Sequence, residues 1–174
     1  DILPRIISAG IFRPVYIEHR DNCNFNECYL QTSEINDDSC DLAFFYKCNF
    51  DKKPGSKWSI ILEGNCGESI FKEEFLLSFQ FGKHLFSFAN PLLWNPRGSG
   101  DQNIYNIKAT LFEDGNTCAS VKFKHGIRTI RLIRNPVSKE NNKGDFHFLV
   151  NGKKVFAKGT NWVPADAFHS RDIK

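Results

Sequence analysis

The chain has 174 residues, of which 41% are hydrophobic and 25% charged, and this globular composition argues against intrinsic disorder and allows a sizeable core. The formal net charge is +3, but acidic and basic residues are interspersed, so we expect no nucleic-acid partner. No apolar run approaches the roughly 20 residues of a membrane-spanning helix, so we expect no membrane partner.

The first expected element covers residues 13–19. Its side chains alternate in a strand-like way after a Gly-Ile-Phe lead-in at Gly10, and Asp21, Asn22 and Asn24 end the pattern, which predicts one isolated strand. The chain starts at Asp1 rather than at a methionine and contains no Met, which favours a piece of a longer protein.

Seven further short stretches are rich in β-branched and aromatic residues, which favours strands over helices. Turn-forming residues separate them, among them Gly64-Asn65, Phe81-Gly82 and the hairpin signal Asp114-Gly115. Strands at this spacing, with no sustained helical periodicity, predict an all-β fold, an immunoglobulin-like antiparallel β-sandwich. The expected strands are residues 25–35, 41–50, 58–62, 69–77, 84–89, 104–112 and 118–133.

The six cysteines form no CxxC pair and have no Cys/His spacing suited to zinc, so we expect neither a metal nor a cofactor. Cys48, Trp58 and Cys118 imitate the Cys, Trp, Cys order of antibody domains, but Asn116 stands where that fold has a tyrosine. We therefore expect free thiols and a reducing, cytoplasmic location, with a lysosomal or secreted location as the alternative.

Residues 135–145 have little apolar content and form the strongest linker candidate in the chain. After them, residues 146–150 and 154–158 flank Asn151-Gly152, a two-residue turn typical of a β-hairpin. Residues 159–166 then lead into a possible helix start. A hairpin and a loop cannot bury a core alone, so this part is expected to be the leading edge of a further domain.

Three segments now resemble one family, the family 2 glycoside hydrolases. Residues 10–17 (GIFRPVYI) resemble the end of its N-terminal sugar-binding jelly roll. Residues 93–100 (LWNPRGSG), followed by Ile104-Tyr105, resemble the Leu-Trp-x-Pro-x-Gly-x-Gly and Leu-Tyr pattern of its sandwich domain. Residues 148–166 (FLVNGKKVFAKGTNWVPAD) resemble the entry to its catalytic (β/α)8 barrel.

The resemblance implies a domain layout and a branch of the family. Residues 1–20 would be the last strand of the jelly roll, 21–135 the sandwich, 136–144 a linker and 145–174 the start of the barrel. The run from Asn161 to Asp166 is similar to β-mannosidases rather than to β-galactosidases. The parent is therefore expected to hydrolyse terminal β-D-mannosides, with a β-mannoside or related oligosaccharide as substrate.

The resemblance also implies where the chemistry takes place. Retaining hydrolysis needs two carboxylates about 5 to 5.5 Å apart, and in this family both are glutamates on later barrel strands. Glu73, Glu74, Glu113 and Glu140 lie in sandwich or linker contexts, so we assign no catalytic residue and expect the chain alone to be inactive. Its partners would be the jelly-roll and barrel domains, through intramolecular packing.

The loop after the first barrel strand supplies the candidate substrate-binding residues Asn161, Trp162 and Asp166, because barrel enzymes build their sites at the C-terminal ends of strands. Trp162 could offer a flat apolar face to a sugar ring, and Asn161 or Asp166 could bond to its hydroxyl groups. The alternative is that Trp162 packs in the protein and Asp166 caps the next helix.

For the other large aromatic residues, Trp58, Trp94 and Tyr105, we expect core or interdomain packing, because buried aromatic rings supply much of the apolar burial of a sandwich. The competing function is a stand-alone carbohydrate-binding or protein-binding module, since sandwich folds host many unrelated roles. The barrel-entry motif favours the glycosidase, because an independent module has no use for it.

Overall fold

A computed structural model of the chain describes residues 10–11, 13–17, 22–51, 53–134 and 144–163. Within these residues the secondary structure consists of ten β-strands and no helix, so the expected all-β class is confirmed. The described part contains no helix that could cross a bilayer. Its residues 22–157 belong to one compact unit, and residues 10–17 (other than 12) and 158–163 belong to another.

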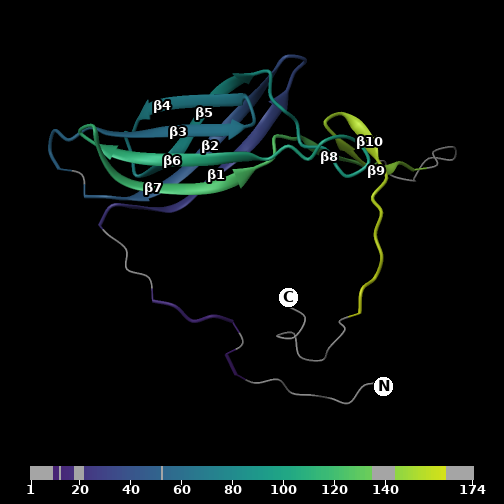
Figure 1. The fold of residues 1–174 in the computed structure, drawn as a ribbon, viewed down its shortest axis with the longest axis horizontal. Helices are drawn as coiled ribbons and strands as arrows, with labels where there is room; N and C mark the ends of the chain where they lie inside the picture. The colour runs from purple at the N-terminus through teal and green to yellow at the C-terminus, as the bar shows by residue number, and fades with distance from the viewer. Residues whose placement is uncertain (1–9, 12, 18–21, 52, 135–143, 164–174) are drawn as a thin grey trace. The chain divides into compact units, whose positions relative to one another are not determined.

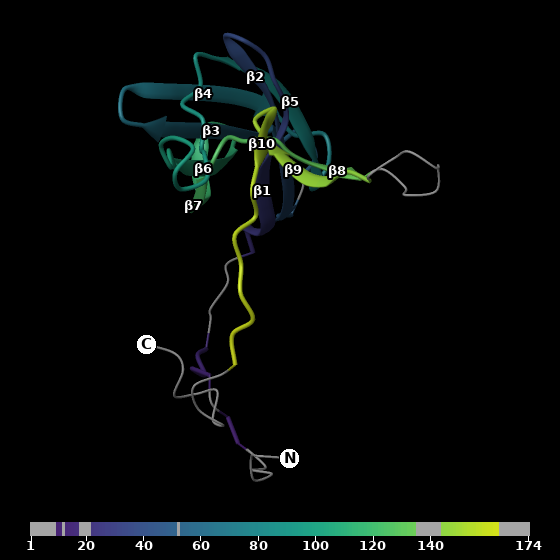
Figure 2. The same ribbon diagram turned by 90° about the vertical axis from the view of Figure 1, so that its right-hand side faces the viewer.

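Seven strands form two antiparallel sheets (Figure 1). The first sheet has the order β1-β2-β5, with β1 at Asn24–Ile35, β2 at Ser39–Asn49 and β5 at Phe81–Ala89. The second has the order β4-β3-β6-β7, with β3 at Trp58–Cys66, β4 at Ser69–Leu76, β6 at Tyr105–Glu113 and β7 at Asn116–His125. A small third sheet, β10-β9-β8, contains β8 at Ile130–Arg134, β9 at Phe146–Val150 and β10 at Lys153–Val155 (Figure 2).

The two larger sheets pack face to face over one apolar core. Alternate side chains of each strand point inward, which is the period of two that a half-buried strand requires. Aromatic rings bridge the layers: the ring centroids of Phe71 and Phe88 are 5.1 Å apart, and those of Phe50 and Trp58 are 4.1 Å apart. The side chains with no more than 1% exposure are Cys40, Leu42, Phe44, Ile60, Leu62, Tyr105, Ile107, Ala109, Leu111 and Ile127. The predicted antiparallel sandwich is therefore confirmed.

Both predicted two-residue hairpin turns are confirmed. Asp114 and Gly115 connect β6 to β7 with φ angles of 50° and 83°. Asn151 and Gly152 connect β9 to β10 with φ angles of 50° and 73°. Positive φ at both central residues is what a type I′ turn needs, and Asn, Asp and Gly tolerate it best. Local chemistry alone therefore specified these two connections.

The expected divider at Gly64-Asn65 is wrong, because β3 runs through both residues and turns only after Cys66, where Gly67 has a φ of 58°. Gly64 is a glycine for a different reason. A Cβ built on Gly64 would lie 2.3 Å from the nearest atom of the Phe71 ring and 2.9 Å from Cδ1 of Ile107. The missing side chain makes room for a core ring that comes from the neighbouring strand.

Phe81-Gly82 is likewise not a divider, since both residues belong to β5. Gly82 pairs across the sheet with Tyr46 of β2. A Cβ on Gly82 would lie 2.7 Å from the Tyr46 hydroxyl oxygen, so the glycine again makes room for a neighbouring ring rather than a turn.

The single strand expected over residues 118–133 is two strands, β7 and β8. Between them Gly126 passes close to the indole of Trp94, because a Cβ there would lie 3.0 Å from Cβ and Cγ of Trp94. Ile127 is fully buried in the core, and its carbonyl accepts a hydrogen bond from the Trp94 amide at 2.9 Å. The pairing of β7 with β6 ends before this buried contact. The chain then leaves the sandwich, and β8 pairs with β9.

Residues 13–17 are also assigned to no strand in the structure, although a strand was expected over residues 13–19. A strand is defined by its ladder partners, and alternation alone does not supply one. Val15, Tyr16 and Ile17 are largely exposed, at 76%, 80% and 100%. The expectation that this segment ends a jelly roll stays a prediction.

The cysteine side chains behave as part of the sandwich. Cys40 and Cys48 belong to the buried core, and neither of them, nor Cys28, Cys66 or Cys118, forms a disulfide bond. Burial raises the pKa of the Cys48 thiol to about 12 and the pKa values of Cys28 and Cys40 to about 11. These three thiols therefore stay protonated at neutral pH, where only the thiolate would react.

Candidate functional site

The predicted substrate-binding residues Asn161 and Trp162 lie in the exposed segment 158–163, which has neither strand nor helix. The side chain of Trp162 is 82% exposed and that of Val163 is 74% exposed. Asp166 lies outside the described residues. Of the predicted site, the structure therefore describes only Asn161 and Trp162, and both are accessible to solvent.

The Leu-Trp-Asn-Pro motif, in contrast, is built into a well-defined junction with the small sheet. The Asn151 side chain donates hydrogen bonds from Nδ2 to the Trp94 carbonyl at 2.9 Å and to Oδ1 of Asn95 at 3.1 Å. Its Oδ1 accepts a hydrogen bond from the amide of Thr129 at 3.0 Å. One side chain in the β9–β10 turn thus connects the motif loop to the start of β8.

The indole of Trp94 is covered on this junction rather than offered to a ligand. The guanidinium carbon of Arg128 lies 4.6 Å from the centroid of the indole ring, within range of a cation–π contact. Arg128 also donates a hydrogen bond from Nη1 to the carbonyl of Gly126 at 3.3 Å. These contacts bear out the expected packing role of Trp94.

Trp58 and Tyr105 are also core residues, 3% and 0% exposed. Nε1 of Trp58 donates to the hydroxyl of Ser56 at 3.0 Å, so the indole N–H is satisfied. The Tyr105 hydroxyl accepts a hydrogen bond from the Leu92 amide at 2.8 Å and shares another with the Ser69 hydroxyl at 2.8 Å. Their polar groups are used internally, as buried aromatic residues require.

The glutamates expected to have sandwich roles lie on sandwich strands where the structure describes them: Glu73 and Glu74 on β4 and Glu113 at the end of β6. Oε2 of Glu73 lies 3.4 Å from Nε2 of His84. Glu140 lies outside the described residues. Within the described ranges, no group of three or more His, Cys, Asp or Glu side chains could hold a metal ion.

A partly buried histidine, His125, lies at the end of β7 beside the junction. Its Nε2 is 3.3 Å from the hydroxyl of Thr32 on β1, and the Arg128 amide donates to the same hydroxyl at 3.4 Å. Burial, with a smaller contribution from the positive charge of Arg128, lowers the pKa of His125 to about 4. The imidazole is therefore neutral at physiological pH.

We expect this histidine to make the sandwich less stable in mild acid. Because the pKa falls from 6.5 in the unfolded chain to about 4 in the folded chain, the unfolded state binds more protons between these values. Stability contributed by neutral His125 is present above pH 6.5 and is lost as the pH falls towards 4. After allowance for solvent screening of a partly exposed ring, the loss is about 1 kcal/mol.

Urea unfolding of the wild-type chain and of His125→Gln between pH 7 and pH 4 measures this effect. The Gln variant should show a shallower decline in the free energy of unfolding, because it has no proton to bind at this position. Identical pH slopes for the two proteins would show that His125 does not contribute.

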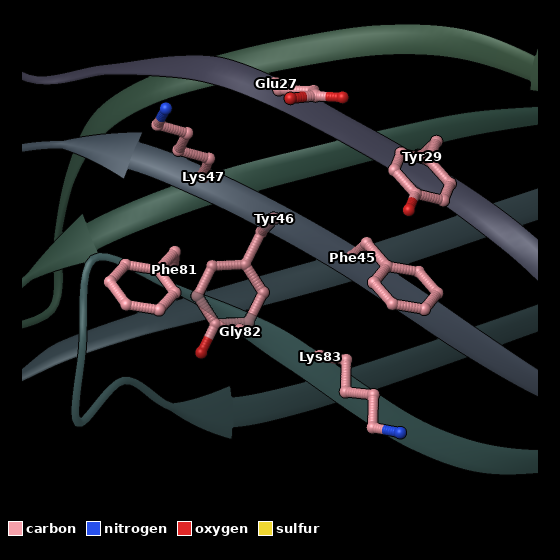
Figure 3. Close-up of a pocket in the computed structure, with 8 residues that line it drawn as sticks. All are labelled: Glu27, Tyr29, Phe45, Tyr46, Lys47, Phe81, Gly82 and Lys83. Atoms are coloured by element: carbon pink, nitrogen blue, oxygen red, sulfur yellow. The ribbon is translucent and has the colours of Figure 1, made fainter.

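The outer face of the β1-β2-β5 sheet contains a feature that the sequence reasoning missed. Aromatic side chains of this sheet point outward around a hollow of about 360 Å³ (Figure 3). The signal was present in the sequence, because consecutive aromatic residues such as Phe44 and Phe45 must point to opposite faces of a strand. The residues lining the hollow are Glu27, Tyr29, Phe45, Tyr46, Lys47, Phe81, Gly82 and Lys83.

Comparison with known proteins gives one family match. Residues 32–128, more than half of the chain, match the model of the family "Glycosyl hydrolases family 2". The matched residues run from β1 to the segment between β7 and β8, so they cover the sandwich and the motif loop.

Curated relatives and a solved structure agree with this match. Beta-mannosidase A of Aspergillus niger is 44% identical over 88 residues, covering 47% of this chain and 10% of the relative. Beta-mannosidase B of Aspergillus flavus is 29% identical over 164 residues, covering 94% of this chain and 19% of the relative. The crystal structure of a Beta-D-Mannosidase from Dictyoglomus thermophilum aligns with a TM-score of 0.72 at 24% identity, over 87% of this chain and 18% of that chain. The chain thus spans between a tenth and a fifth of the length of these proteins.

Proposed function

Because the chain belongs to the family 2 glycosyl hydrolases, we propose that it is the sandwich domain, with the start of the catalytic barrel, of a retaining enzyme that hydrolyses terminal β-D-mannosides. The observation that carries the substrate class is the similarity to two groups of curated β-mannosidases, at 44% and 29% identity. The family match also favours the glycosidase over an independent binding module.

We keep the predicted domain layout as part of this proposal: jelly-roll end at 1–20, sandwich at 21–135, linker at 136–144 and barrel start at 145–174. The pairing of β8 with β9 adds a feature to it. The strand before the linker and the hairpin after it form one sheet, and Asn151 bonds that sheet to the sandwich loop. In the parent enzyme this junction would hold the sandwich against the barrel.

Exposed apolar side chains on the small sheet support a neighbouring domain. Ile130, Leu132, Phe146 and Phe148 share one face, because Leu132 pairs with Phe148 and neighbours two positions along a strand point the same way. Three of them are well exposed, Ile130 at 55%, Leu132 at 48% and Phe146 at 71%. Arg134, which pairs with Phe146, lies at the end of the same face. Exposed apolar side chains grouped in this way are typical of an interaction surface, and the barrel of the parent would cover them.

We also retain the immunoglobulin-like class and the cytoplasmic location as proposals. The division into β1-β2-β5 and β4-β3-β6-β7 supports the first, although constant-type immunoglobulin domains place four strands in the first sheet and three in the second. The second is supported by Cys40 and Cys48, which serve as buried core side chains with protonated thiols.

In this proposal the chemistry belongs to two glutamates outside the chain. One carboxylate attacks the anomeric carbon while the other protonates the departing glycosidic oxygen, and water then releases the sugar from the glycosyl-enzyme. Trp162 and Asn161 would line the substrate site, and Asp166 would either bond to the sugar or cap the following helix. The Trp162 side chain is exposed in this chain, which agrees with an indole that contacts either the sugar or the rest of the barrel in the parent enzyme.

The chain alone should show no turnover of aryl β-mannosides, whereas the complete enzyme should hydrolyse them. In the complete enzyme, Trp162→Ala should lower kcat/KM about tenfold or more, because a large stacking or packing surface is lost. Trp162→Phe, which keeps a ring, should recover part of the loss.

Two results would contradict the proposal. One is hydrolysis by the purified chain that follows the protein through gel filtration. The other is a Trp162→Ala enzyme with unchanged kcat/KM and unchanged stability, which would show that this loop is not part of the active-site wall.

A further inference from the structure

The outward-facing side chains of β1, β2 and β5 form two rows that run across the strands. Tyr29, Phe45 and Lys83 are cross-strand partners in the first row, and Glu27, Lys47 and Phe81 are partners in the second. The inward neighbours of these residues, such as Leu30 and Phe44, are buried in the core. The rows therefore lie on the outer surface of the sandwich.

Aromatic rings make up the apolar part of this surface. The rings of Tyr29 and Phe45 stack with centroids 4.8 Å apart and an angle of 13° between their planes. Tyr29 is 45% exposed and Phe81 is 68% exposed. In Figure 3 the rings of Phe45 and Phe81 are seen nearly face-on, so flat apolar faces are available to a ligand.

Charged groups border the rings. Figure 3 shows the ammonium groups of Lys47 and Lys83 on opposite sides of the aromatic side chains, with the Glu27 carboxylate near Tyr29. Among the described residues, the side chains of Glu27, Lys47 and Lys83 form no hydrogen bond or ion pair. The hollow thus combines apolar ring faces with unused donors and an unused acceptor.

This combination fits a sugar better than a protein surface. Lys and Glu are depleted at the centres of protein interfaces, whereas here three charged side chains lie directly beside the rings. A pyranose has an apolar C–H face that stacks on an aromatic ring and hydroxyl groups around its edge that bond to charged side chains. A volume of about 360 Å³ also lies within the usual range of small-ligand sites, roughly 300 to 1,000 Å³.

We propose that the hollow lined by Tyr29, Phe45 and Phe81 is an oligosaccharide-binding site on the outer face of the sandwich. It would hold a saccharide chain on the sandwich by ring stacking, with Lys47, Lys83 and Glu27 bonding to its hydroxyl groups. The choice of a mannose-containing oligosaccharide rests on the proposed function. The inference that the site binds a saccharide rests on the arrangement of rings and charged side chains alone.

The test is titration of the ¹⁵N-labelled 174-residue chain with a β-1,4-linked manno-oligosaccharide, followed by amide chemical shifts. We expect saturable shifts that concentrate at the outward positions of β1, β2 and β5. Phe45→Ala and Phe81→Ala should each weaken binding about tenfold, the loss of one stacked ring. Leu76→Ala, which removes an apolar side chain that is 74% exposed on the other sheet, should leave the Kd unchanged.

Phe81 is well exposed, so its variant keeps the test valid if Phe45→Ala disturbs the fold. Absence of shifts, shifts confined to residues 158–163, or an unchanged Kd in Phe81→Ala would each overturn the site. Self-association of the chain through this face, detected by sedimentation velocity and abolished by Phe81→Ala, would overturn it as well.

Failure of this inference can be told apart from failure of the proposed function. Binding by the chain requires no catalytic carboxylate, and hydrolysis of a small aryl β-mannoside requires no contact with the sandwich. If the chain binds no saccharide but the parent enzyme is active, only the proposed binding site is wrong. If the chain binds but the parent enzyme is inactive, only the proposed hydrolase function is wrong.

Discussion

Replacement of Asn151 by alanine should release the small sheet from the sandwich. The side chain makes three hydrogen bonds, to the Trp94 carbonyl, the Asn95 side chain and the Thr129 amide. Its φ of 50° is also a conformation that alanine adopts only with strain. The hydrogen bonds and the strain together give an expected loss of about 2 to 4 kcal/mol.

Amide hydrogen exchange locates the effect. Residues of β8, β9 and β10 should exchange much faster in Asn151→Ala, while amides in the sandwich core, such as those of Leu62 and Leu111, serve as the internal reference. Equal protection of the small sheet in wild type and variant would show that Asn151 does not hold it.

Two further substitutions separate the contributions. Asn151→Gly keeps the positive φ at no cost and loses only the side-chain hydrogen bonds, so it should be less damaging than alanine. Asn151→Asp keeps the acceptor for the Thr129 amide but loses both donations to the motif loop. If Gly and Ala variants are equally stable, backbone strain contributes nothing at this turn.

Replacement of Gly64 by valine should destabilise the sandwich as a whole. Even the Cβ atom would meet the Phe71 ring at 2.3 Å, and this ring has little freedom to move because it packs against Phe86, Phe88 and Tyr105. Overpacking of a well-ordered core typically costs 1 to 3 kcal/mol, and we expect about 3 kcal/mol here because valine adds two methyl groups beyond Cβ.

Denaturant unfolding measures this loss, and a double substitution identifies its cause. Phe71→Leu should destabilise the wild-type chain but should partly relieve Gly64→Val, because the smaller side chain makes room. Gly159→Ala is the matched control, since a Cβ there meets nothing within 4 Å and its φ is not positive. Strict additivity of the two core substitutions would rule out the collision between positions 64 and 71.

The Leu-Trp-Asn-Pro motif has a structural explanation in this chain. Trp94 and Asn95 contact Asn151 of the next sheet, and the Trp94 indole contacts Arg128 of the connecting segment. The motif thus determines how the chain passes from the sandwich into β8–β10.

Local sequence was sufficient to predict most strands and both tight hairpins. Period-two alternation sets which side chains of β3 are buried. Asp114-Gly115 and Asn151-Gly152 specify the β6–β7 and β9–β10 turns through φ preferences alone. The barrel-entry resemblance likewise came from consecutive residues. These features depend on neighbours within a few positions, which is the information that a single sequence contains directly.

Tertiary structure decided what depends on partners far along the chain. Gly64 remains in a strand because β3 pairs there with β4 and, through Ile107, with β6. β7 ends where Gly126 meets Trp94, more than 30 positions earlier. The outward rows of Tyr29, Phe45 and Phe81 exist only because β1, β2 and β5 pair in one register. The sequence by itself therefore determined most elements and their tight turns, whereas side-chain packing between distant strands decided where the elements end and which of their faces stay exposed.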